Sequence, residues 1–172
     1  LRVDENEAGI GDGLARTLVD ARVELCEDPW PLAELRRRGP ELGVPIAIDA
    51  AVVRDATAAL AAAREGQVAA VVLKPTALGG LLRARALARA AHALGVRAIV
   101  SHALESPIGV AACAHLALAL GVGETHGLGR YAGLDGFRVG AHTASIEVPD
   151  WLAPSELRRP MGPGLGVTVE RV

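Results

Sequence analysis

The sequence predicts an α/β protein, and within that class an incomplete (β/α)8 TIM-type barrel of about six strand–helix units with a C-terminal tail. Two observations predict it. Short apolar runs each end in a polar residue and are each followed by a helical stretch, which is typical of parallel strands joined by crossover helices. The polar residues that end successive runs are 22 to 27 residues apart, a nearly constant step of one strand, one helix and two loops.

The expected strands are the apolar runs 1–3, 23–26, 45–48, 68–73 and 97–100. The segments 11–19, 31–38, 51–64, 80–94 and 107–120 are rich in Ala, Leu and Arg, which favour helix. Four of these segments are followed by a glycine that can close a helix in the left-handed conformation: Gly39, Gly66, Gly95 and Gly121. Each expected strand is therefore followed by an expected helix.

Both an open doubly wound sheet and a closed barrel are built from such units. An open nucleotide-binding sheet gathers its ligand at a glycine-rich loop after the first strand, and no Gly-x-Gly-x-x-Gly motif follows the run 1–3. In a barrel, every strand directs its carboxyl end into one mouth. Polar residues at five successive strand ends, followed by a polar turn at 125–129, favour the barrel; they are Asp4, Glu27, Asp49, Lys74 and Ser101.

Composition narrows the classes of partner. The chain has 20 acidic and 18 basic side chains and only two Trp, one Tyr and one Phe, so it lacks the positive field and stacking platforms of nucleic-acid binding proteins. The uncharged stretch 106–123 contains a proline, a histidine and glycines, which suits a buried helix better than a membrane span. Cys26 and Cys113 lie in apolar stretches, as expected of buried thiols in a reducing compartment. We expect a cytoplasmic protein with no nucleic-acid or membrane partner, and the oligomeric state stays open.

Three consecutive strand ends carry a carboxylate, namely Asp4, Glu27 and Asp49. An all-oxygen set without His or Cys predicts Mg²⁺, or alternatively Mn²⁺. The alternative is that these acids cap the helices that follow. Lys74 would point into the same mouth, either as a base whose pKa is lowered by desolvation beside a cation or as an ion-pair partner of a carboxylate. A metal and a lysine at one mouth suit removal of a proton α to a carboxylate.

Motifs spread over almost the whole chain carry a family resemblance. They are Val3-Asp4-x-Asn6, Glu27-Asp28-Pro29, Ile46-Ala47-Ile48-Asp49, Leu73-Lys74-Pro75-Thr76-x-x-Gly79-Gly80, the segment 101–109, His126-Gly127-Leu128 and the segment 162–166. Together they resemble the barrel domain of the o-succinylbenzoate synthase family, in the muconate cycloisomerase branch of the enolase superfamily.

The resemblance implies a carbon–oxygen lyase of menaquinone biosynthesis. Its reaction is the Mg²⁺-dependent syn dehydration of 2-succinyl-6-hydroxy-2,4-cyclohexadiene-1-carboxylate to o-succinylbenzoate through an enediolate. Asp4, Glu27 and Asp49 would bind the Mg²⁺, and Lys74 would be the catalytic lysine of the sixth barrel strand. The substrate is a small-molecule carboxylate, which would contact Ser101, Glu105, Ser106, Gly127 and Leu128.

The resemblance also implies parts that these residues do not include. Residues 1–129 would form the third to eighth strands, and residues 130–172 would pack outside the barrel. The first two strands, with the Lys-x-Lys that supplies the base, and a capping domain would precede Leu1, so we expect these 172 residues alone to be inactive. Ala50 replaces an acidic residue of the family, which leaves the orientation of Lys74 open. An N-succinylamino acid racemase, a dipeptide epimerase and a non-catalytic barrel remnant are the alternatives.

Overall fold

The computed structural model describes residues 1–121, 123–129, 144–146, 164–165 and 169–171. The chain divides into two compact units, and each is described by itself. The first unit comprises Leu1–Leu73 and Ala86–Ala98, and the second comprises Lys74–Arg85 and Ile99–Val172.

The strands form one five-stranded sheet whose order follows the chain: β1 (Arg2–Asp4), β2 (Leu25–Glu27), β3 (Ile46–Ile48), β4 (Ala70–Leu73) and β5 (Arg97–Val100). Strands β1 to β4 pair in parallel. Every residue of β3 and β4 is buried, as expected of a parallel sheet covered on both faces. All five strands predicted from the sequence are confirmed, each within about two residues of its expected bounds.

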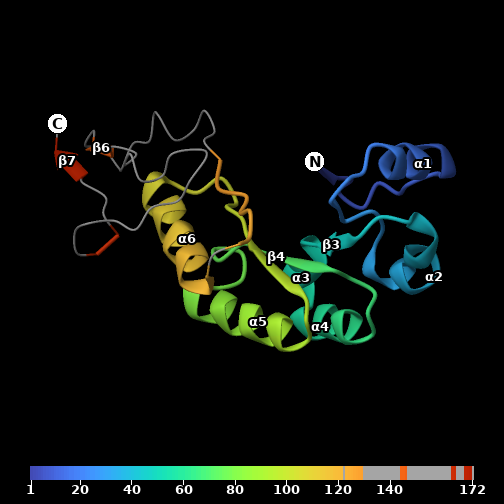
Figure 1. The fold of residues 1–172 in the computed structure, drawn as a ribbon. Helices are drawn as coiled ribbons and strands as arrows, with labels where there is room; N and C mark the ends of the chain where they lie inside the picture. Colours follow the sequence, from blue (N-terminus) through green and yellow to red (C-terminus); the bar gives the residue numbers. More distant parts are fainter. Residues whose placement is uncertain (122, 130–143, 147–163, 166–168, 172) are drawn as a thin grey trace. The chain divides into compact units, whose positions relative to one another are not determined.

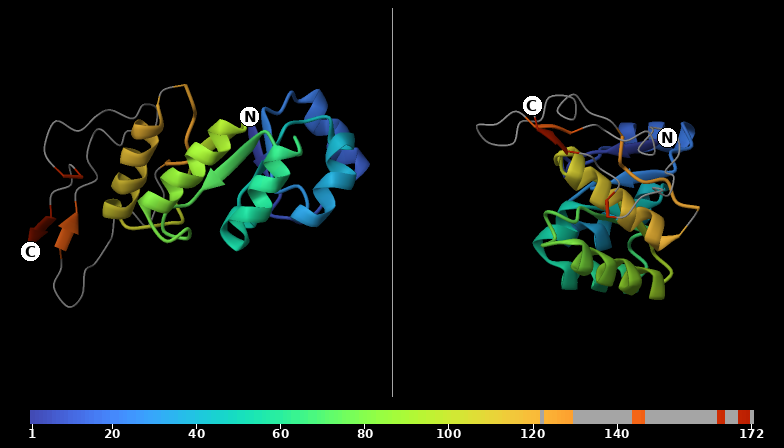
Figure 2. Two further views of the ribbon diagram at one scale, coloured as in Figure 1. Left: turned by 90° about the horizontal axis from the view of Figure 1, so that it is seen from below. Right: turned by 90° about the vertical axis from the view of Figure 1, so that its left-hand side faces the viewer.

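Helices alternate with these strands, and Figures 1 and 2 show the alternation running along the first unit from blue to green. They are α1 (Asp12–Asp20), α2 (Leu32–Leu42), α3 (Ala50–Arg54), α4 (Ala56–Arg64), α5 (Leu81–Ala93) and α6 (Pro107–Leu120). Leu18 of α1 and Leu35 of α2 are among the buried residues that attach these helices to the core. The α/β alternation predicted from the sequence is therefore confirmed.

The prediction that Gly39 closes the second helix is wrong. Helix α2 runs through Gly39 to Leu42, and its closing residue is Gly43, which has the left-handed φ of +71°. A Cβ atom at position 39 would lie 3.3 Å from Cδ1 of Ile46, which is tighter than ordinary contact. Gly39 therefore lets the helix approach β3 closely instead of ending it.

The predicted helix at 51–64 is split in two by Asp55. This residue has an extended backbone with φ −152° and ψ 90° and is the N-cap of α4. Its Oδ1 accepts hydrogen bonds from the backbone N–H groups of Thr57 and Ala58, both at 3.0 Å. These bonds satisfy amides that have no partner inside a helix, so the chain gains a second helix start at this point.

Ion pairs link strands of the first unit at their amino ends. Glu24, just before β2, accepts hydrogen bonds from Arg2 at 2.9 Å and from Arg97 at 2.6 Å. The bond between Arg97 and Glu24 connects residues beside β5 and β2, which are three positions apart in the sheet order.

The second unit contains α6 and the turn at 123–129. Backbone hydrogen bonds attach this turn to β5: the N–H of Gly127 donates to Val100 O at 2.8 Å, and Ser101 and Gly127 form an isolated parallel bridge. This contact lies where the sequence predicted the end of a last strand. Strands β6 (Ala144–Ile146) and β7 (Val169–Arg171) pair antiparallel. Most of residues 130–172 lie outside the described residues, so their packing stays a prediction.

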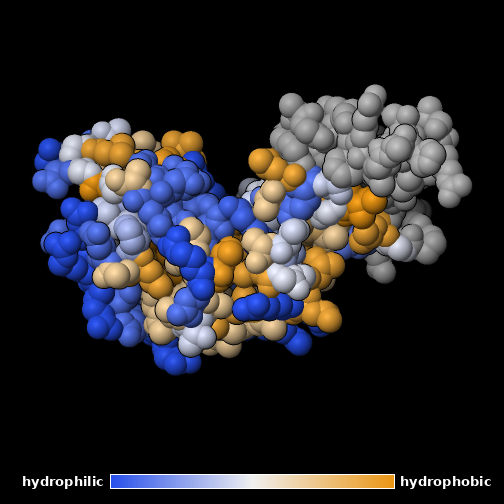
Figure 3. Space-filling view, turned by 180° about the vertical axis from the view of Figure 1, so that it is seen from behind, coloured by the Kyte–Doolittle hydropathy of each residue, from blue (hydrophilic) through white to orange (hydrophobic). Residues whose placement is uncertain are grey.

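Helix α6 buries one side, including Val110, Cys113 and Leu116, as predicted for this uncharged stretch. Figure 3 shows hydrophobic side chains at the surface of the second unit. Among the described residues of this unit, the exposed large hydrophobic ones are Leu81, Leu82, Leu104 and Ile108. In the described part of the chain, no helix combines the length and the apolar character needed to cross a membrane.

Candidate functional site

The three predicted metal ligands lie at the same edge of the first unit's sheet. Asp4 and Glu27 are the last residues of β1 and β2, and Asp49 directly follows β3. The strand register pairs Asp4 with Glu27, and Glu27 with Ala47, two residues before Asp49. The parallel ladder thus brings carboxylates to the carboxyl ends of three neighbouring strands.

Helix capping does not account for these acids. Helices α1 and α2 begin after Gly11 and Pro31, and neither cap involves a side-chain hydrogen bond. Asp49 is the N-cap residue of α3, yet its side chain makes no capping hydrogen bond either. Asp4 accepts a local bond from the N–H of Asn6 at 2.9 Å. The alternative that the strand-end acids serve only to start helices therefore loses its support.

The three carboxylates share an edge but do not form a closed ligand cluster. Within the residues that the structure describes, no group of three or more His, Cys, Asp or Glu side chains is arranged to hold a metal ion. The donor set itself, three carboxylates on adjacent strands, has the chemistry that a hard cation such as Mg²⁺ requires. Ligation by all three requires their carboxylates to move closer together, and their role as ligands stays a prediction.

Asp28 is the residue of this edge that the sequence reasoning missed. It is only 4% exposed. Its Oδ1 accepts a hydrogen bond from the N–H of Asp49 at 3.0 Å, and its Oδ2 accepts one from the N–H of Ala50 at 2.9 Å. Burial raises the pKa of the Asp28 carboxyl above its ordinary value, against the lowering effect of these two amides. The signal in the sequence is an aspartate between a strand-end glutamate and Pro29.

Several carboxylates give the carboxyl edge a negative field. Cys26 is fully buried in β2, one residue before Glu27. Burial raises the pKa of its thiol to about 11, and the neighbouring carboxylates add to this rise, in decreasing order Glu5, Asp4, Asp28 and Glu27. A field that opposes a thiolate attracts a cation, so the electrostatics of this edge favour divalent-cation binding.

Lys74 begins the second unit, directly after β4, and its side chain is partly exposed. Its carbonyl accepts the N–H of Leu78 at 3.0 Å in the turn that leads to α5. Gly79 and Gly80 complete this turn with φ of +87° and +121°, which other residues rarely adopt. Lys74 is also the only lysine among the 18 basic residues of the chain, all the others being arginines.

The predicted substrate contacts belong to the second unit as well. Ser101 donates its hydroxyl to Gly127 O at 3.2 Å, and Ser106 accepts the N–H of Gly109 as the N-cap of α6. Glu105 accepts the N–H of Ala103 at 2.5 Å, and Leu128 is buried. The structure brings Ser101 and Gly127 together, and the substrate-binding role of the five residues stays a prediction.

The turn at 126–129 is held to the end of β5 by two histidines. His126 Nδ1 accepts the N–H of Val100 at 3.0 Å. His102 Nδ1 accepts the N–H of Leu104 at 3.1 Å, so its proton is on Nε2, which lies 3.1 Å from Gly129 O and donates to it. A Cβ atom at Gly127 would lie 2.7 Å from Ser101 Oγ. Only glycine fits this close approach.

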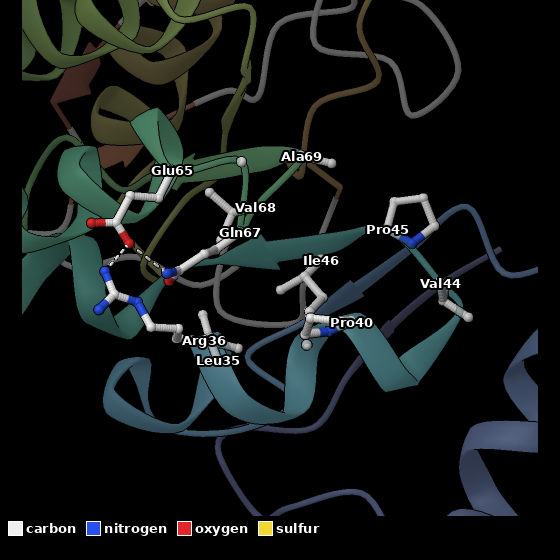
Figure 4. Close-up of a pocket in the computed structure, with 12 residues that line it drawn as sticks. Leu35, Arg36, Pro40, Val44, Pro45, Ile46, Glu65, Gln67, Val68 and Ala69 are labelled. Atoms are coloured by element: carbon white, nitrogen blue, oxygen red, sulfur yellow. Dashed lines mark hydrogen bonds and ion pairs between the residues drawn. The ribbon is translucent and has the colours of Figure 1, made fainter.

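A hollow of about 560 Å³ lies elsewhere in the first unit (Figure 4). Its lining includes Leu35 and Pro40 of α2, Pro45 and Ile46 at the start of β3, and Ala69 just before β4. These positions are at the amino ends of the strands, opposite to the carboxylates. In (β/α)8 enzymes the chemistry takes place at the carboxyl ends, so this hollow is not the candidate site.

A family model described as enolase C-terminal domain-like matches residues 13–172. The chain belongs to the enolase C-terminal domain-like family. A curated relative, an o-succinylbenzoate synthase from Yersinia enterocolitica, is 35% identical over 124 residues, which are 68% of this chain and 38% of that protein. The chain therefore spans well under half the length of this relative.

Solved structures show the fold of this enolase-like domain. A muconate cycloisomerase variant matches with a TM-score of 0.71 and 25% identity, over 98% of this chain and 47% of that one. A dipeptide epimerase from Enterococcus faecalis matches with a TM-score of 0.69 and 24% identity, over 98% of this chain and 49% of that one. The predicted fold class, a partial (β/α)8 barrel of the enolase superfamily, is confirmed.

Proposed function

We propose that the full-length protein containing this chain is an o-succinylbenzoate synthase. Its substrate would be the small carboxylate 2-succinyl-6-hydroxy-2,4-cyclohexadiene-1-carboxylate, acted on in the cytoplasm. A base would take the proton α to the carboxylate, and the electron pair of that C–H bond would move toward the carboxylate. It would then form the new ring double bond as the hydroxyl leaves with a proton as water. The name of the relatives that are 35% and 36% identical supports this reaction over others of the superfamily.

Mg²⁺ would be held by Asp4, Glu27 and Asp49, and it would supply a positive charge that stabilises the negative charge formed on the substrate carboxylate. The chemistry of three carboxylates and the negative field around Cys26 support this assignment. The base that removes the proton is a lysine that the family resemblance assigns to a strand before β1. The residues of this chain would then orient the substrate and keep a cation next to it.

The observation that carries the proposal is the place of the only lysine. Lys74 follows β4, the strand paired with β3, and so it comes next after the three strands that end in carboxylates. The chain uses arginine at every other basic position, which shows that a permanent surface charge does not require lysine here. A compact ammonium can approach a reacting ring more closely than a guanidinium.

The test is an assay of the full-length protein for the aromatic product, with Mg²⁺ and with a chelator. We expect activity only with the metal. Lys74→Arg and Lys74→Met should each lower kcat by about 100-fold or more, because a positioned lysine contributes at least that much. Arg85→Lys, at an exposed position of α5, is the matched control and should leave kcat unchanged. Racemisation of N-succinylamino acids without dehydration would contradict the proposal and favour the racemase alternative.

A further inference from the structure

Asp28 occupies an unusual position for a buried carboxylate. Its side chain comes from the end of β2, but both of its oxygens bind the backbone at the junction of β3 and α3. Its backbone reaches two further segments: its N–H donates to Ala47 O at 2.9 Å, and its carbonyl accepts the N–H of Glu7 at 2.7 Å. Asp28 thus connects the loop after β1, the end of β2 and the end of β3.

The two amides that Asp28 accepts belong to the N-cap and first residues of α3. An N-cap aspartate commonly binds the N2 and N3 amides of its helix with its own carboxylate, as Asp55 does at the start of α4. Asp49 makes no such capping bond in α3. Asp28 instead binds, from the neighbouring strand, the two amides that come just before those, which are the amides of Asp49 itself and of Ala50.

We propose that Asp28 is a positioning residue that fixes the backbone of Asp49 so that the Asp49 carboxylate can serve as a cation ligand. The inference rests on the proposed function, in which Asp49 binds the metal. Two hydrogen bonds at 2.9 and 3.0 Å to consecutive amides fix the direction in which the Asp49 side chain leaves the main chain. The carboxylate is nearly inaccessible to water, so few water molecules compete for these bonds.

The test measures Mn²⁺ affinity by electron paramagnetic resonance on the full-length protein. Asp28→Asn keeps the size of the side chain and tolerates the left-handed φ of +43° at this position, but it retains one acceptor oxygen. We expect it to weaken Mn²⁺ binding about 10-fold or more, and Asp28→Ala, which retains none, to weaken it further. Asp55→Asn is the matched control, because Asp55 also accepts two backbone amides at a helix start. It should leave the affinity within about twofold of the wild type.

A purely structural role for Asp28 predicts that Asp28→Asn and Asp55→Asn lower the melting temperature but not the Mn²⁺ affinity. That result overturns the inference. Asp49→Asn distinguishes a failure of the positioning role of Asp28 from a failure of the metal site. If Asp49→Asn weakens Mn²⁺ binding and Asp28→Asn does not, the metal site stands and the positioning role fails. If Asp49→Asn has no effect, the metal assignment in the proposed function fails, and the inference fails with it.

A second measurement requires no substitution at Asp28. By linkage, a metal that needs the Asp28 bonds should in turn strengthen them. Mg²⁺ should therefore slow amide hydrogen exchange at Asp49 and Ala50 more than at Thr57 and Ala58, the amides bound by Asp55. Equal slowing at both pairs contradicts the inference.

Discussion

The carboxylates at the two ends of the strands in the first unit have opposite surroundings. At the amino ends, Glu24 is bound by Arg2 and Arg97, and these hydrogen bonds lower the pKa of its carboxyl from 4.5 to about 2. At the carboxyl ends, acids gather on neighbouring strands, burial raises the pKa of Asp28, and burial together with the nearby carboxylates raises the pKa of the Cys26 thiol to about 11. The difference indicates that the amino ends stabilise the sheet, and it agrees with the proposal that the carboxyl ends bind a ligand.

The largest effect on stability is expected at the amino ends. Leu35 of α2 is fully buried beside the hollow, so Leu35→Ala should lower the free energy of unfolding by about 2 to 5 kcal/mol. Leu35→Met should cost less than about 1.5 kcal/mol because it keeps the volume. Urea unfolding gives both values. Leu35→Ala should leave the Mn²⁺ affinity unchanged. A large loss of Mn²⁺ affinity in this variant would contradict the separation of a stabilising amino end from a cation-binding carboxyl end.

The corresponding change at the carboxyl ends is Glu27→Gln. The amide keeps the shape of the side chain but removes the negative charge, so the activity of the full-length protein should fall more than about 100-fold. A residue that only orients a metal ligand usually costs about 10- to 100-fold when it is replaced. The free energy of unfolding should change by less than about 1 kcal/mol, since Glu27 is only partly buried. A large loss of stability with activity retained would reverse the roles of the two ends.

A smaller effect is expected for Glu24→Gln. The Glu24 side chain is 45% exposed, so solvent screens its ion pairs and they contribute no more than about 1 kcal/mol. Thermal melting should detect this loss, and it should shrink in high salt. Metal affinity and activity should not change, and a drop in either would show that the amino ends also act on the site.

The smallest effect is the pH dependence of this same contribution. The folded protein holds the pKa of Glu24 near 2, below its ordinary value of 4.5, so the folded state binds fewer protons than the unfolded state between these values. The stabilisation by Glu24 is therefore fully present above about pH 4.5 and is lost as the pH falls toward 2. The stability difference between wild type and Glu24→Gln should shrink over this range, and a constant difference would contradict the assignment.

The sequence predicted most of the fold because strand ends and helix ends carry local signals. The five apolar runs, and Gly66 and Gly95 with φ of +73° each, marked their boundaries correctly. Gly39 misled the prediction because its lack of a side chain serves a contact with Ile46, a tertiary requirement that the local pattern does not contain. The break at Asp55 did have a local signal, an N-cap residue inside an alanine-rich stretch, which the helical composition obscured.

The candidate site was predictable only in part. The spacing located Asp4, Glu27 and Asp49 on adjacent strand ends, and the register confirms that placement. Asp28 was missed because its partners, the amides of Asp49 and Ala50, are 21 and 22 residues away and become neighbours only through strand pairing. No spacing rule distinguishes a carboxylate that faces a ligand from one that binds the backbone.

The central claim is that the carboxyl ends of β1 to β3 bind a divalent cation. The most direct measurement is a Mn²⁺ titration of the full-length protein, followed by electron paramagnetic resonance, for the wild type, Glu27→Gln and Glu24→Gln. We predict a saturable site that Mg²⁺ displaces, that Glu27→Gln removes and that Glu24→Gln leaves intact. No saturable binding by the wild type, or equal binding by both variants, would contradict the account.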